Sequence, residues 1–102
     1  MNLIYHIVPA ADWAKQENQP IYEAPSLQTE GFIHLSQKEQ VAGTLSRYYK
    51  NMPDLLLLHV DTGKLTNELK YELATNNESF PHLYGFLNKD AVVHIETLDA
   101  QL

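Results

Sequence analysis

The chain has 102 residues, enough for one domain around a single hydrophobic core, and 44% of them are hydrophobic, which argues against a disordered protein. Thirteen acidic residues against seven basic ones give a formal net charge of -6, which disfavours binding to the phosphate backbone of a nucleic acid. The sequence contains no cysteine, which excludes disulfide bonds, thiolate metal ligands and a thiol nucleophile.

The first third of the chain predicts a strand, a helix and a connector. Residues 3–8 alternate as a strand does, and His6 shares one face of it with aliphatic side chains. Residues 10–17 have a helix-forming composition. Residues 18–30 include two prolines but also apolar side chains that would not be left in water, so they predict an ordered connector.

A short apolar strand within residues 30–36 runs directly into a helix. Ser36 and Glu39 have the spacing of a capping box, in which the serine hydroxyl caps a backbone N–H and the glutamate reaches back. The helix that follows should end near Asn51, before a proline, and its apolar stripe should pack on a sheet.

The second half of the chain predicts mainly strands. Residues 55–60 are continuously apolar, which indicates a central strand buried on both faces, and residues 61–63 form a turn. Residues 69–73 predict a strand, with a helix as the alternative, and residues 80–85 predict a proline-containing turn. Residues 91–98 close the chain as a strand. This order favours an α+β fold with a mostly antiparallel sheet.

Chemically active side chains gather where the short strand meets the helix. Alternation places Phe32, His34 and Ser36 on one face of the strand, and an imidazole beside a helix start is typical of a site. We interpret His34 as functional; the alternative is an edge histidine bonded to a carbonyl. A capping role already explains Ser36. Ser36 and His34 would also point the same way from one strand face rather than at one another, so we disfavour a serine nucleophile with His34 as its base. Ser36 would then serve in binding.

The other candidates are compatible with both functional and structural roles. His6 on its apolar strand face and His82 beside a proline suit either a site or plain packing. We interpret Glu72 as an ordinary exposed carboxylate on a strand; the alternative is that it belongs to the site. His59 and His94 are interpreted as structural.

The phrases that carry these residues resemble a known family. They are Ile4–Ile7, Ser26–Leu27, Glu30–Ser36 (EGFIHLS), Tyr71–Glu72 and Phe80–Gly85 (FPHLYG), and together they look like the bacterial domain-of-unknown-function family 952 (DUF952). The resemblance spans nearly the whole chain, and it implies that residues 1–102 form a single domain of this family. It implies an ADP-ribosyltransferase-like fold, with small split antiparallel sheets and two short helices around a cleft for a nicotinamide dinucleotide.

The resemblance also implies roles for individual residues. His6 would contact ribose, His34 with Ser36 would lie at the nicotinamide, and Glu72 would contact the nicotinamide ribose, where a carboxylate stabilises developing positive charge. The substrate-binding side chains would be Tyr5, Phe32, His82 and Tyr84, together with Ser36. Lys70 stands where arginine-specific transferases carry an acidic residue or glutamine, which disfavours arginine as the acceptor.

Three functions follow as competing hypotheses. The first is an enzyme directed at NAD or ADP-ribose, a transferase or glycohydrolase, with NAD as the candidate substrate and His6, His34 and Glu72 as catalytic residues. The second is a noncatalytic domain that binds a nucleotide or small metabolite. The third is a metal site built from His6, His34, His82 and Glu72, but the histidines lack the short spacings typical of metal ligands, so we expect no metal cofactor.

The expected partner is thus a small nucleotide ligand rather than a nucleic acid or a membrane, and the sequence does not identify a protein acceptor. The first residues lack the pattern of a signal peptide, and the longest apolar run is too short to cross a bilayer, so we expect a cytoplasmic protein.

Overall fold

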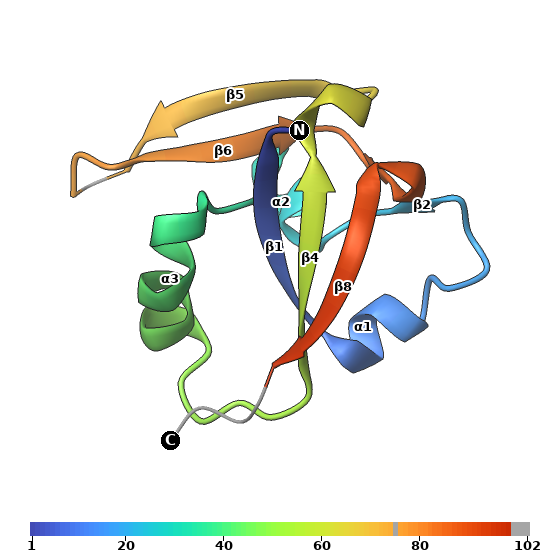
Figure 1. The fold of residues 1–102 in the computed structure, drawn as a ribbon, viewed down its shortest axis with the longest axis horizontal. Helices are drawn as coiled ribbons and strands as arrows, with labels where there is room; N and C mark the ends of the chain where they lie inside the picture. Colours follow the sequence, from blue (N-terminus) through green and yellow to red (C-terminus); the bar gives the residue numbers. More distant parts are fainter. Residues whose placement is uncertain (75, 99–102) are drawn as a thin grey trace.

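In a computed structural model, which describes residues 1–74 and 76–98, the chain forms small antiparallel sheets accompanied by short helices (Figure 1). The main sheet has the order β1-β4-β8 and consists of β1 (Leu3–Pro9), β4 (Leu55–Asp61) and β8 (Val92–Leu98). The second sheet has the order β3-β6-β5 and consists of β3 (Ile33–His34), β6 (Ser79–Tyr84) and β5 (Glu68–Leu73). A two-stranded pair joins β2 (Ile21–Tyr22) to β7 (Leu87–Asn88). The α+β class with small antiparallel sheets is therefore confirmed.

The helices are short, with five to eight residues each. They are α1 (Ala10–Ala14), α2 (Ser26–Glu30) and α3 (Val41–Tyr48), with 3-10 turns η1 (Lys38–Gln40), η2 (Thr62–Lys64) and η3 (Lys89–Ala91). Both predicted helices are found but end earlier than expected, and α2 adds a third. None of the helices in residues 1–74 and 76–98 has the length and apolar character needed to cross a membrane.

The main sheet separates two apolar clusters, because successive residues of a strand face opposite sides of the sheet. The larger cluster contains Ile4 and Val8 of β1 together with residues of all three sheets, and the smaller one contains Tyr5 and Ile7 packed beside Leu45 of α3. Strand β4 is central and contributes to both clusters, as its continuous apolar sequence predicts. The alternation along β1 therefore turns His6 toward the larger cluster.

The segment 18–30 is ordered and buries Tyr22, as predicted, but it is more than a connector, because it contains β2 and α2. Its prolines lie where a strand or helix begins: Pro20 immediately precedes β2, and Pro25 is the N-cap of α2. A proline is tolerated at such a start because no backbone N–H is needed there. Gly31, with φ of 88°, ends α2 in the left-handed conformation and turns the chain into β3.

The predicted capping box is displaced by one residue. The backbone N–H of Gln37, rather than Ser36, donates to the side chain of Gln40 at 2.9 Å, at the start of η1. Ser36 still belongs to the extended chain, since its backbone exchanges two hydrogen bonds with Tyr5 of β1 at 2.7 and 2.8 Å. The helix therefore begins later than its sequence signal indicates.

The prediction of a turn over residues 80–85 is also wrong. Residues Ser79–Tyr84 form β6, the middle strand of the second sheet, and Pro81 lies within it. The carbonyl of Pro81 accepts from Leu35 N at 3.0 Å, while the ladder with β3 stops at the pair His34–His82, so the missing N–H of Pro81 falls beyond the end of β3. The strand predicted over residues 69–73 is confirmed as β5, and its helical alternative is wrong.

Candidate functional site

The open face of the second sheet collects most of the predicted site residues. Ile33 and Leu83 turn inward and are fully buried. Their neighbours along β3 and β6 turn outward, because successive strand residues face opposite sides. We call the resulting surface the histidine face and define it as Glu30, Phe32, His34, Glu72, His82 and Tyr84.

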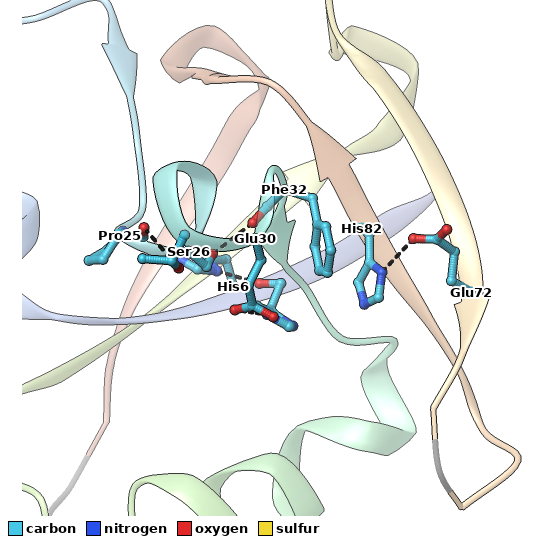
Figure 2. A network of polar contacts seen from close by, with 9 residues as sticks. His6, Pro25, Ser26, Glu30, Phe32, Glu72 and His82 are labelled. Carbon is cyan, nitrogen blue, oxygen red and sulfur yellow. Dashed lines mark hydrogen bonds and ion pairs between the residues drawn. The ribbon is translucent and has the colours of Figure 1, made fainter.

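Phe32 is the centre of the aromatic contacts on this face. Its ring stacks on the imidazole of His82, as Figure 2 shows, and the two ring centroids are 4.1 Å apart. The Phe32 ring also lies tilted against Tyr84, with the centroids 5.3 Å apart. His34 and His82 are direct cross-strand neighbours, and their rings meet edge to face at 5.3 Å. The Ser26 hydroxyl donates to the carbonyl of Phe32 at 2.8 Å, which anchors this part of the chain to α2.

Glu72 connects two side chains of the neighbouring strand. Its Oε1 atom accepts hydrogen bonds from Tyr84 Oη at 2.6 Å and from His82 Nδ1 at 2.7 Å. The bond from Tyr84, followed by that from His82, lowers the pKa of Glu72, and the same contact with Glu72 raises the pKa of Tyr84. Glu72 is therefore an ionised carboxylate, held by two donors and still 39% exposed.

A second carboxylate holds the other imidazole of the face. Glu30, the last residue of α2, lies 3.0 Å from Nε2 of His34, and both side chains are about half exposed, at 48% and 52%. Sequence reasoning did not single out Glu30, although it precedes His34 by four residues across the Gly31 turn. The face thus carries two imidazoles, each bound to its own carboxylate.

His6 lies in the core rather than on this face. Its residue exposure is 7%, and its Nδ1 donates to the backbone carbonyl of His34 at 2.7 Å. Since Nδ1 carries the proton, Nε2 is free to accept from the hydroxyl of Tyr22 at 3.4 Å. Burial lowers the pKa of His6 to about 4, against a smaller opposing effect of the bond to His34. His6 is a neutral link between β1, β2 and β3 and does not share a surface with the His34 imidazole.

Two further predicted residues also lie away from the histidine face. Tyr5 is 8% exposed and packs edge to face on His59 at 4.9 Å, in the cluster beside α3. Ser36 is 4% exposed, and its hydroxyl lies 3.2 Å from that of Thr44. The structure therefore brings together Phe32, His34, Glu72, His82 and Tyr84, and it separates them from His6, Tyr5 and Ser36.

The side chains named in the metal hypothesis do not converge. His6 uses both ring nitrogens inside the core, whereas His34, His82 and Glu72 lie on the open face. Within residues 1–74 and 76–98, no group of three or more histidine, aspartate or glutamate side chains is arranged to hold a metal ion. Two pockets, of about 310 and 680 Å³, lie elsewhere, at α1–α2 and at β2–β7, and none of the predicted site residues lines them.

The comparisons with known proteins give the family and the fold. A family model described as "Protein of unknown function (DUF952)" matches residues 7–95. The crystal structure of protein CC0527 from Caulobacter crescentus is 34% identical, covers 96% of this chain and 87% of that one, and superposes with a TM-score of 0.88. The solution NMR structure of CC0527 is 35% identical, with coverage of 97% and 86% and a TM-score of 0.83.

A double mutant of CC0527 gives a similar match, with 33% identity, coverage of 96% and 87%, and a TM-score of 0.88. Among curated proteins, none matches this chain. The family match and the resemblance to CC0527 agree over nearly the whole chain. The protein therefore belongs to DUF952, a family of proteins of unknown function.

Proposed function

We propose that this protein is an enzyme directed at NAD or ADP-ribose, a transferase or glycohydrolase of ADP-ribosyltransferase-like fold, and that it works on the histidine face. Split antiparallel sheets with a glutamate on the edge strand of the second sheet support this proposal. Phe32 and Tyr84 supply aromatic surface for a nicotinamide or adenine ring.

The state of Glu72 is the observation that carries the proposal. Both donors bind its Oε1 atom, and among the described residues Oε2 makes no hydrogen bond. An ionised, ordered and partly exposed carboxylate is what stabilises a ribose that becomes positively charged as its glycosidic bond breaks. In the proposed reaction the bond between C1′ and the nicotinamide nitrogen breaks, and nicotinamide leaves with the electron pair as a neutral molecule. Glu72 faces the resulting cation.

In this proposal the two histidines expected to be catalytic have different tasks. His34 lies on the reacting surface, where its ring contacts Phe32 at 4.9 Å. His6 supports it from behind, because it holds the His34 backbone carbonyl without reaching the surface. Lys70 places its ammonium over the Tyr84 ring at 5.0 Å, where it offers a positive charge to the pyrophosphate.

Glu72→Gln tests the proposal directly. Nicotinamide release from NAD is measured together with ligand-observed NMR of NAD, ADP-ribose and nicotinamide. We expect a loss of release of about a hundredfold or more in Glu72→Gln, in line with the loss of one electrostatic contact to a transition state. Glu68→Gln is the matched control, since Glu68 lies on the same face of β5 opposite Tyr84. Wild-type protein that neither binds these ligands nor releases nicotinamide would refute the proposal.

A noncatalytic binding domain is the second candidate, and the exposure of the histidine face favours it. The side chains of His34, Glu30 and Glu72 are 52, 48 and 39% exposed, whereas enzymes commonly exclude water from the reacting atoms. In this case NAD or ADP-ribose binds without turnover, and Glu72→Gln only weakens the binding.

A further inference from the structure

The proposed reaction needs a group that activates the acceptor, and Glu72 does not supply it. A water molecule or an alcohol keeps its proton at neutral pH and attacks slowly unless a base removes that proton. Glu72 already accepts two hydrogen bonds and has the separate task of facing the ribose. We therefore looked for a base next to this carboxylate.

His82 has the geometry of such a base. Because the carboxylate of Glu72 only accepts, the 2.7 Å contact places the proton of a neutral His82 on Nδ1 and leaves a lone pair on Nε2. Among residues 1–74 and 76–98, nothing forms a hydrogen bond to that Nε2 atom. Stacking on Phe32 at 4.1 Å and 19° between the ring planes fixes the orientation of the imidazole.

The free nitrogen also lies close to the proposed reacting atoms. The carboxylate that would face the ribose cation binds Nδ1, and one carbon separates Nδ1 from Nε2, so a single imidazole ring links this carboxylate to the atom that would take the proton. Figure 2 shows the ring of His82 between Phe32 and Glu72. The side chain of His82 is 15% exposed, so part of it faces solvent.

Resting on the function proposed above, we infer that His82 is the general base of the reaction and that the acceptor it activates is a hydroxyl group, that of water or of an alcohol. The hydroxyl proton passes to Nε2 of His82, the oxygen bonds to C1′, and the bond from C1′ to nicotinamide breaks with its electron pair on the departing nitrogen. His82 then returns the proton to solvent. The products are neutral nicotinamide, the O-linked ADP-ribosyl compound and one proton.

The surroundings of His82 favour this acceptor class over two others. A carboxylate acceptor is already a nucleophile and would need no base. A guanidinium acceptor would meet Lys70, which lies directly opposite His82 in the β5–β6 ladder. Neutral hydroxyl acceptors avoid this repulsion and require the base.

Azide rescue of a His82 variant tests the inference, because azide attacks without losing a proton. In His82→Asn the amide N–H₂ can still donate to Glu72, but the base is absent. We expect nicotinamide release in water, and transfer to methanol, to fall about a hundredfold or more, in the range of general-base effects. Azide should restore release and give an azido-ADP-ribose product. His94→Asn, on the exposed β8 strand, should behave as wild type.

Two outcomes would overturn the inference. An unchanged rate in His82→Asn, or a loss that azide does not restore, would show that His82 is not the base while the proposed function stands. Wild-type protein that releases no nicotinamide would remove the proposed function and the inference together. If His82→Asn fails to fold, as judged by thermal unfolding, His82→Phe keeps the aromatic stacking on Phe32 and permits the same measurement.

Discussion

Glu72 and His82 form a diagonal contact across two strands. In the β5–β6 ladder Glu72 lies opposite Phe80 and His82 lies opposite Lys70, yet the carboxylate reaches the imidazole at 2.7 Å. Tyr84 reaches the same oxygen from farther along β6. A single edge-strand carboxylate thus orders two side chains of the middle strand.

Removal of the Glu72 charge should make Tyr84 a stronger acid. The hydrogen bond to Glu72 is the largest cause of the raised pKa of Tyr84, so Glu72→Gln should lower that pKa toward the ordinary value of a tyrosine, about 10. Titration of the tyrosine Cζ resonances by NMR measures the change. Glu30→Gln is the control, because Glu30 is not among the causes of the shift, and an equal effect in that variant would contradict the assignment.

His6 should make the fold less stable as the pH falls. Its pKa is about 4 in the folded protein, against about 6.5 in the unfolded chain, so between these values the unfolded chain binds the extra proton. The free energy of unfolding is therefore highest above pH 6.5 and should decrease by about 2 kcal/mol between pH 7 and pH 5 through this group alone.

Urea unfolding at these two pH values measures the effect. His6→Gln should have lower stability at pH 7 but a smaller pH dependence, since the group that titrates is gone. His94→Gln, on the exposed strand β8, is the control and should keep the wild-type slope. A slope that is the same in all three proteins would contradict the burial of a neutral His6.

Gln40, rather than Glu39, should stabilise the start of the α3 region. The Gln40 side chain accepts from Gln37 N at 2.9 Å and donates to the carbonyl of Ser79 at 2.9 Å, which ties η1 to β6. Gln40→Ala should lower the free energy of unfolding by about 1–3 kcal/mol, because it removes both of these hydrogen bonds and leaves the Ser79 carbonyl with the Gln37 side chain as its remaining donor. Glu39→Ala, which would matter if the sequence-predicted capping box formed, should change it by less than about 0.5 kcal/mol. Chemical denaturation of both variants decides between the two caps.

Truncation of Leu58 should show that β4 is the centre of the fold. Leu58 is fully buried in the cluster shared by all three sheets, so Leu58→Ala should cost about 2–5 kcal/mol through lost contacts and the cavity left behind. Leu73→Ala removes the same atoms from a residue that is 72% exposed, and should cost less than about 0.5 kcal/mol. Similar losses in both variants would contradict the described core.

The sequence by itself determined the strands of the main sheet and part of the residue set on the histidine face. The continuous apolar run 55–60 predicts the central strand, and alternation correctly places Phe32 with His34 and Lys70 with Glu72, although it fails at Ser36, which lies beyond the end of β3 and is buried. Such patterns are local, because each residue's side of a strand depends only on its place in the period.

Only the tertiary structure determined which strands pair and which side chains meet. Residues Ser79–Tyr84 became a middle strand because β3 and β5 pair with them on either side, which no local signal of a proline-containing segment indicates. The same pairing brings Glu72 to His82, while the packing of β1 against β3 encloses His6. Register and burial arise between segments far apart in the chain, so the period of any one segment cannot determine them.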